Sequence, residues 1–292
     1  VAAAVAAAKA ADVTVLVVGE DFDHSAESRS RSDLSLPGGQ KALADAILAT
    51  GKPVVLLIMG GRPLAIPDLL AKAPAALMTW LLGVESGTAL ADILLGEVSP
   101  AGRLPMGLPR TAGALPETYA HYPTGRPADP DLAKDTTRYH DLDVGPVYPF
   151  GHGLSYARFD YSGLALDKAA ISDGETLSAT LTVTNTGKVT ADEVVQLYMR
   201  DPVAAVARPV MALRGFRRLT LKPGETRRLT FTLSARQCAF WDAGRWRIEK
   251  GRIDLMVGAS SADIRARAAF MIDQEGWSDT SPAAILTPVT VT

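Results

Sequence analysis

The feature that most constrains the fold is a change in the spacing of apolar residues along the chain. In the first half, short continuous apolar runs such as 13–18 (VTVLVV) alternate with stretches such as 38–50, whose apolar residues recur at helical spacing. In the second half the spacing changes to two, as at Leu177, Ala179 and Leu181. Helices have a period near 3.6 and strands a period of two, so the sequence predicts two domains of different class.

Strands and helices alternate in the first domain. The expected strands are 13–18, 54–59 and 75–81, and the expected helices are 38–50, 64–71 and 86–95. The first strand is apolar throughout, which is typical of a strand buried on both faces of a parallel sheet. The alternation implies right-handed crossovers and a doubly wound, mostly parallel α/β sandwich. Ligands of such sheets bind at the carboxyl ends of the strands, here the loops after Val18, Met59 and Leu81.

The second domain is predicted to be a β-sandwich of about seven short strands, with turns such as Asn185-Thr186-Gly187 between them. We expect Trp241, Trp246 and Phe216 to fill its core. The predicted division is 1–110 for the α/β domain, 111–155 for a long irregular connection packing on it, 156–273 for the sandwich and 274–292 for a tail.

Composition excludes several classes of function. The 292 residues are 47% apolar with a net charge of -2, and the charges are spread along the chain. This balance predicts neither nucleic acid nor an anionic membrane as a partner. The single cysteine, Cys238, excludes an intrachain disulfide and a cysteine-based metal site, and we expect it to be buried as a small hydrophobe. The alanine-rich opening, 1–12, is interpreted as the end of a helix, which suggests that the chain is a fragment or a processed product.

The densest cluster of reactive side chains lies in the loop after the first strand, residues 19–37. It holds five acids, one histidine and two arginines, which could serve acid/base catalysis or form a solvated charged loop. A third reading is a metal site at Asp21, Asp23, His24 and Glu27, but the loop lacks the ligand periodicity of an EF-hand. Neither a dinucleotide fingerprint nor a Walker sequence is present, so no metal or cofactor is predicted.

Several motifs resemble, in order, those of family 3 glycoside hydrolases, especially the periplasmic-type β-glucosidases. In the first domain they are 19–20 (GE), 27–33 (ESRSRSD), 36–37 (LP), 51–55 (GKPVV), 61–64 (GRPL), 91–94 (ADIL) and 100–105 (PAGRLP). Later they are 124–127 (TGRP), 148–156 (YPFGHGLSY), 183–187 (VTNTG), 207–210 (ARPV), 213–216 (LRGF) and 221–225 (LKPGE). The resemblance covers residues 13 to 272 and implies the family's C-terminal α/β sandwich domain followed by a fibronectin-III-like domain.

By this resemblance the chain is the C-terminal part of a retaining exo-β-glycosidase that hydrolyses terminal non-reducing β-D-glucosyl residues. The family uses a nucleophilic aspartate on an N-terminal barrel, which we do not find in this sequence, and a glutamate from the second domain as general acid/base. The motif spacing favours Glu27, ten positions before Pro37, and Glu20 is the competitor because other branches carry the acid just after the strand. The isolated chain is therefore expected to be inactive.

The other expected site residues are Arg29, Arg31, Asp33 and Trp80. The first three are expected to orient the loop, more by salt bridges than by contact with substrate. Trp80 is a candidate for stacking on a sugar or for an interdomain contact, and core packing is the alternative. The resemblance implies β-linked glucosides or oligosaccharides and the barrel as partners, allows a homodimer, and suggests a periplasmic or secreted location. A non-catalytic carbohydrate-binding or scaffolding fragment is the alternative function.

Overall fold

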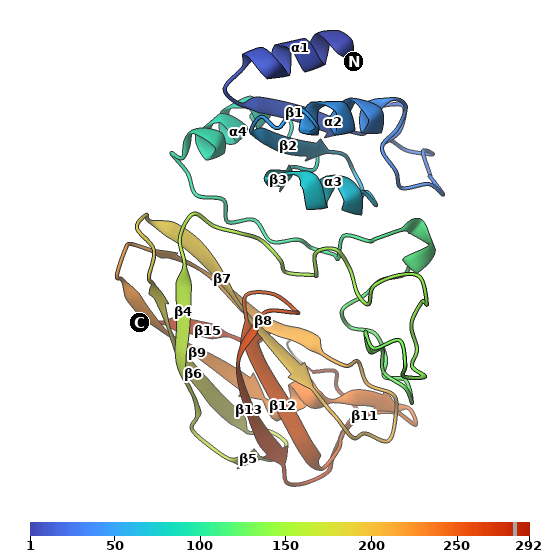
Figure 1. Ribbon diagram of the computed structural model, residues 1–292. Helices are drawn as coiled ribbons and strands as arrows, with labels where there is room; N and C mark the ends of the chain where they lie inside the picture. The colour runs from blue at the N-terminus through green and yellow to red at the C-terminus, as the bar shows by residue number, and fades with distance from the viewer. Residues whose placement is uncertain (283–284) are drawn as a thin grey trace. The chain divides into compact units, whose positions relative to one another are not determined.

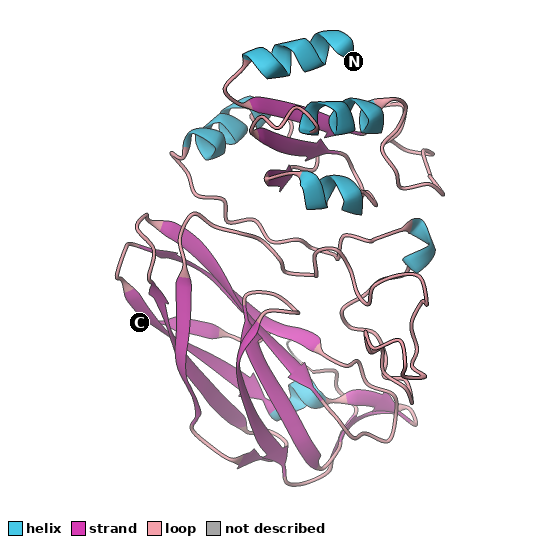
Figure 2. Cartoon of the chain, in the orientation of Figure 1, coloured by secondary structure: helices cyan, strands magenta, loops and turns pink. Residues whose placement is uncertain are grey.

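The computed structural model describes residues 1–282 and 285–292, which form two compact units. The first comprises Val1–Ala91, Met106–Glu117 and Asp141–Tyr148, and the second comprises Asp92–Pro105, Thr118–His140 and Pro149–Thr292. The first is a parallel sheet with helices, and the second is built from mainly antiparallel sheets (Figure 2). This confirms the predicted combination of an α/β domain and a β-sandwich.

The first unit contains three parallel strands in the order β1-β2-β3. The strands are β1 (Thr14–Gly19), β2 (Val54–Met59) and β3 (Ala75–Met78), and the helices are α1 (Ala2–Ala10), α2 (Gln40–Leu48) and α3 (Pro67–Lys72). Helix α4 (Ser86–Leu95) begins in this unit and extends past its boundary at Ala91. Successive strands advance in one direction across the sheet, so right-handed crossovers place α2 and α3 on the same face, as Figure 1 shows.

One face of β1 is covered and the other is open in the described chain. Leu16 and Val18 are buried, whereas Val15 and Val17 on the opposite face are 48% and 53% exposed. The expectation that β1 is buried on both faces is therefore wrong for this chain, because the crossover helices α2 and α3 cover only one side of the sheet.

The second unit contains a five-stranded sheet in the order β5-β13-β12-β7-β8 and a four-stranded sheet in the order β15-β9-β6-β4. Their strands are β4 (Phe159–Leu166), β5 (Ala170–Ile171), β6 (Thr176–Asn185), β7 (Ala191–Arg200), β8 (Ala212–Leu221), β9 (Thr226–Ser234), β12 (Gly251–Gly258), β13 (Ile264–Ile272) and β15 (Val289–Val291). Between the two sheets lies a core of alternate aliphatic side chains, including Leu181, Leu197 and Leu229, completed by Phe231 and Phe270.

The three aromatic residues expected in this core lie outside it. Phe216 is 50% exposed and pairs across the strands with Gln196, on the face opposite to the core residues Val195 and Leu197. Trp241, which is 58% exposed, and Trp246 belong to a separate small sheet of β10 (Phe240–Asp242), β11 (Arg245–Ile248) and β14 (Gly276–Ser278), where their rings pack edge to face with centroids 5.6 Å apart. These three expectations are wrong, since alternate aliphatic residues already fill the space between the sheets.

Residues 274–292, expected as a tail, contain β14 and β15. The edge strand β15 pairs with β9, so backbone hydrogen bonding extends the four-stranded sheet beyond the expected end of the sandwich. The short apolar segment VTV that forms β15 is too brief to predict a strand from its periodicity alone.

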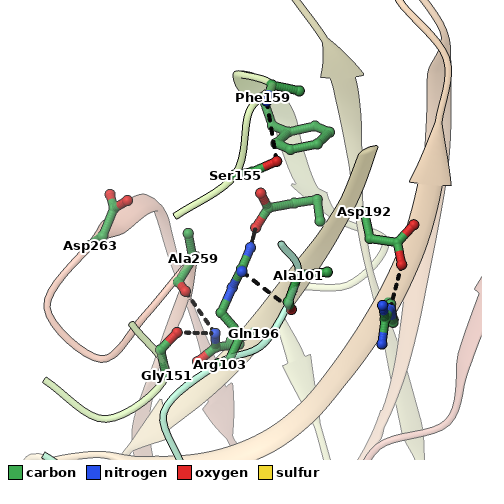
Figure 3. Close-up of polar contacts among 12 residues, drawn as sticks. Ala101, Arg103, Gly151, Ser155, Phe159, Asp192, Gln196, Ala259 and Asp263 are labelled. Carbon is green, nitrogen blue, oxygen red and sulfur yellow. Dashed lines mark hydrogen bonds and ion pairs between the residues drawn. The ribbon is translucent and has the colours of Figure 1, made fainter. Parts of the chain in front are cut away.

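Part of the long connection packs on the sandwich. Gln196 on β7 donates hydrogen bonds to the carbonyls of Gly151 and Ala259 at 3.1 and 2.7 Å, as Figure 3 shows. The ring of Tyr119 stacks on Phe150 with centroids 4.1 Å apart. The connection was expected to pack on the α/β domain, but only 111–117 and 141–148 of it belong to the first unit. Buried hydrogen bonds of Gln196, which apolar periodicity does not reveal, account for the difference.

The lone cysteine is buried, as expected. Cys238 lies at the end of a short 3-10 helix, Ala235–Cys238, and burial raises the pKa of its thiol to about 12. The thiol is therefore protonated at neutral pH and unsuited to nucleophilic chemistry.

Asn185 fixes the turn after β6 through a fully buried side chain. Its amide nitrogen donates to the carbonyls of Val189 and Leu221 at 2.9 and 2.8 Å, and its amide oxygen accepts from the nitrogen of Gly187 at 2.8 Å. We expect Asn185→Ala to lower the free energy of unfolding of the sandwich by roughly 2–4 kcal/mol, because buried carbonyls lose their donors. Urea unfolding monitored by tryptophan fluorescence measures the change. Lys188→Ala, an exposed change in the same turn, is the control, and equal effects of both changes would contradict the assignment.

Candidate functional site

The loops that follow the three parallel strands meet at one edge of the first unit's sheet. Gly19 at the end of β1 pairs with Met59 at the end of β2, and Ile58 pairs with Met78 at the end of β3. The longest of these loops, 20–37, carries the candidate acid/base residues. Its position agrees with the general placement of ligands at the carboxyl ends of parallel strands.

Glu20 is the buried anchor of this loop. Its side chain has no exposed surface, and its two carboxylate oxygens accept from Nη1 of Arg31 at 2.8 Å and from Nε of Arg62 at 3.0 Å. A carboxylate that burial has removed from water requires charged hydrogen-bond donors of this kind. Glu20 therefore joins the beginning of the loop to its later part and to the segment that follows β2.

The same two arginines also bind backbone carbonyls. Nη2 of Arg62 donates to the carbonyls of His24 and Arg29, each at 2.8 Å, and Nη2 of Arg31 donates to the carbonyl of Ser35 at 3.0 Å. These contacts fix the course of the loop from residue 24 to residue 35. Most of the loop is irregular, so side-chain hydrogen bonds take the place of a backbone ladder.

Close packing at the base of the loop requires glycine. A side chain at Gly61 would place its Cβ 2.4 Å from the hydroxyl oxygen of Ser25, which accepts a hydrogen bond from the nitrogen of Gly61 at 3.1 Å. Gly19 has a φ of 137°, and a Cβ there would lie 1.7 Å from the carbonyl oxygen of Met59. Gln40, the first residue of α2, binds the backbone of Gly19 through its side-chain amide. The amide oxygen accepts from the nitrogen of Gly19 at 2.7 Å, and the amide nitrogen donates to the Gly19 carbonyl at 2.8 Å.

Glu27 lies on the exposed outer part of the same loop. Among the residues that the structure describes, its carboxylate makes no hydrogen bond or ion pair. The next residue, Ser28, has a φ of 59°, a left-handed conformation that is uncommon for residues other than glycine. Such strained positions cluster at functional sites. The loop thus holds one buried, doubly paired glutamate and one displayed, unpaired glutamate.

The other expected site residues occupy different environments. Arg31 is the ion-pair partner of Glu20, whereas Arg29 is exposed and contributes its carbonyl to Arg62. Asp33 accepts from the nitrogen and hydroxyl of Ser35 at 2.8 and 2.7 Å, and these hydrogen bonds lower the pKa of its carboxyl. Asp33 therefore stabilises a local turn.

Trp80 follows β3 and is half-buried, with a φ of 54°. The preceding residue, Thr79, is buried and bonds the carbonyl of Ile58 through both its nitrogen and its hydroxyl, at 2.9 and 3.0 Å. Trp80 therefore follows a strand end that two hydrogen bonds hold in place. Its own backbone is in the left-handed conformation, in the loop after β3.

The acids expected as an alternative metal site do not assemble into one. Asp21 contacts Nδ1 of His24 at 2.5 Å, and this hydrogen bond lowers the pKa of the Asp21 carboxyl. Within 1–282 and 285–292, no group of three or more His, Cys, Asp or Glu residues could hold a metal ion. In the same residues, no helix combines the length and apolar character needed to cross a membrane.

Arg62 was not predicted as a site residue, although its motif, 61–64, was noted. A single arginine after a glycine pair has no periodic or spacing signal, and its partner Glu20 is 42 residues away in the sequence. The same applies to Gln40. Both roles depend on strand pairing that brings distant loops together.

Comparison with known proteins identifies the family. Residues 1–156 match the glycosyl hydrolase family 3 C-terminal domain, and residues 193–261 match a fibronectin type III-like domain. Because the first match covers more than half of the chain, the chain belongs to glycosyl hydrolase family 3, of which it is a β-glucosidase-like C-terminal portion.

The relatives are named either beta-glucosidase or beta-xylosidase. A periplasmic beta-glucosidase of Salmonella typhimurium is 42% identical over 90% of this chain and 34% of its own length. A beta-xylosidase of Formosa agariphila is 41% identical over 88% of this chain and 35% of its own length. The crystal structure of a beta-glucosidase from Listeria innocua in complex with glucose superposes with a TM-score of 0.89 at 34% identity, covering 94% of this chain and 38% of that one. The chain thus spans about a third of the length of these relatives.

The different environments of the two glutamates predict effects of very different size on stability. Glu20→Ala leaves Arg31 and Arg62 without a buried carboxylate, so we expect the free energy of unfolding of the first unit to fall by roughly 3–5 kcal/mol. Glu27→Ala removes an exposed, unpaired group and should leave stability nearly unchanged. Urea unfolding followed by helical circular dichroism measures the difference, since α1, α2 and α3 lie in the first unit. A larger loss from Glu27→Ala than from Glu20→Ala would contradict this account.

Proposed function

We propose that this chain supplies the general acid/base, Glu27, to a retaining exo-β-glycosidase that acts on terminal non-reducing β-D-glucosyl residues. The observation that carries the proposal is the division of roles in the loop after β1. Glu20 is buried with both oxygens bound by arginines, whereas Glu27 is exposed and unpaired. A proton donor must reach a substrate oxygen, which the carboxyl of Glu20 cannot do without breaking its ion pairs.

In the proposed reaction, the Glu27 carboxyl donates its proton to the glycosidic oxygen as the bond to the anomeric carbon breaks. An aspartate from the N-terminal barrel attacks that carbon and forms a covalent glycosyl-enzyme. The Glu27 carboxylate then accepts a proton from water, whose oxygen displaces the aspartate. Retaining enzymes of this kind hold their two carboxyl groups about 5–5.5 Å apart.

The proposed barrel is part of the complete protein or a separate chain, and two observations support it. The chain spans about a third of the length of its relatives. The first unit also leaves large apolar side chains uncovered, among them Val15, Val17, Leu81 and Val84, which are 48%, 53%, 62% and 100% exposed. Exposed apolar surface of this kind is typical of contacts with another domain or protein. Without a nucleophile the isolated chain should be inactive.

The proposed substrates are β-linked glucosides or oligosaccharides, in agreement with the beta-glucosidases among the relatives. The relative described as a beta-xylosidase is almost as similar, so overall sequence identity does not distinguish a preference for glucose from one for xylose. Trp80 is proposed as a sugar-stacking residue, and Arg29, Arg31 and Asp33 as residues that orient the loop. The name of the Salmonella relative supports a periplasmic or secreted location.

The test is Glu27→Ala in the complete enzyme. We expect kcat/KM toward glucosides with poor leaving groups to fall by about 10²–10⁴-fold, because these substrates require protonation of the departing oxygen. Activated aryl glucosides should lose much less, and added azide should partly restore their turnover by attacking the glycosyl-enzyme. Steady-state kinetics on a series of leaving groups gives the comparison.

The control is Asp68→Ala, which removes an exposed carboxylate at the start of α3. It should leave the dependence on the leaving group unchanged. An equal loss of activity on all substrates after Glu27→Ala would contradict the assignment of Glu27 as the general acid/base.

A further inference from the structure

We propose that Arg62 is a positioning residue that holds Glu27 where it can reach the glycosidic oxygen. This proposal rests on the proposed function of Glu27. Arg62 lies in the segment after β2 and contacts three points of the loop after β1: the Glu20 carboxylate, the His24 carbonyl and the Arg29 carbonyl. The two carbonyls stand on either side of Glu27 in the sequence. The side chain of Arg62 is only 22% exposed, so these contacts are largely protected from water.

The two carbonyl contacts of Arg62 require the chain to reverse direction between His24 and Arg29. One atom, Nη2 of Arg62, lies 2.8 Å from both carbonyl oxygens, although His24 and Arg29 are five residues apart. Five extended residues span roughly 17 Å. The chain between these residues must therefore reverse direction, and Ser28, at a φ of 59°, provides a left-handed residue within the reversal. Glu27 lies on the resulting bend.

Arginine has the shape that this arrangement needs. Its planar guanidinium pairs with the Glu20 carboxylate through Nε while Nη2 faces the bend, so one rigid group fixes the bend relative to the strand end. A lysine could keep the ion pair with Glu20 but could not hold all three acceptors in the same fixed geometry. Placement matters because a displacement of about 1 Å can reduce a rate by roughly 10²-fold.

The first test uses the 292-residue chain and does not depend on its catalytic role. In Arg62→Met and Arg62→Lys, backbone amides of residues 24–29 should exchange with deuterium faster, while those of β1 and β2 stay protected. Arg236→Met is the matched control, because Arg236 also binds a carboxylate, that of Asp173, and further groups, but in the second unit. Unchanged exchange of residues 24–29 in both Arg62 variants would overturn the proposal, whatever Glu27 does.

The second test uses the complete enzyme. Arg62→Met should lower kcat on glucosides with poor leaving groups by about 10²-fold, with a smaller loss on activated aryl glucosides and little change in KM. Arg62→Lys, which keeps a positive charge beside Glu20, should show the same pattern to a lesser degree, and Arg236→Met should not show it. Equal losses on all substrates would overturn the positioning role.

The outcomes of the two proposals are distinguishable. If Glu27→Ala fails to show dependence on the leaving group, the proposed function is wrong and faster loop exchange in Arg62→Met reports structure alone. If Glu27→Ala shows that dependence and the Arg62 variants do not, Glu27 is the acid/base and the positioning role of Arg62 is wrong.

Discussion

The candidate site depends on one buried interaction, the pairing of the Glu20 carboxylate with Arg31 and Arg62. A carboxylate with no exposed surface is tolerated only when charged donors replace its water, and here each oxygen has one. Once held by Glu20, both arginines can bind backbone carbonyls of the same loop. A long irregular segment thereby acquires a defined course, and the proposed proton donor is displayed on its outer side. The proposed proton donor and the residue that organises the loop are thus different glutamates.

The architecture could be predicted from the sequence because apolar spacing changes with the type of element. The runs at 13–18 and 54–59 became β1 and β2, and the alternation from Leu177 to Val183 became β6. The prediction did not identify β4 or β13. β4 is an edge strand interrupted at Gly163 by an irregular register, and β13 carries Arg265 and Arg267 among its apolar residues. The break at Gly163 and the arginines at 265 and 267 interrupt the apolar alternation that would otherwise mark a strand.

The candidate site was only partly predictable, because loop contacts depend on which strands are neighbours. The sequence located the loop after β1 and favoured Glu27 over Glu20 from motif spacing. It did not indicate Arg62 or Gln40, whose partners are 42 and 21 residues away and are brought near by the pairing of β1 with β2 and the packing of α2. The exposure of Trp241 and Phe216 was missed for a related reason, since hydrophobicity alone does not say which face of a sheet is covered.

The central claim is that Glu27 acts on the substrate while Glu20 only organises the loop. A crystal structure of the complete enzyme with a bound, unhydrolysed glucoside tests it most directly. The account predicts the Glu27 carboxyl within hydrogen-bonding distance of the glycosidic oxygen and about 5–5.5 Å from an aspartate carboxylate of the barrel, with Glu20 still paired with Arg31 and Arg62. A structure in which Glu20 contacts the glycosidic oxygen, or in which Glu27 faces solvent away from the sugar, would contradict it.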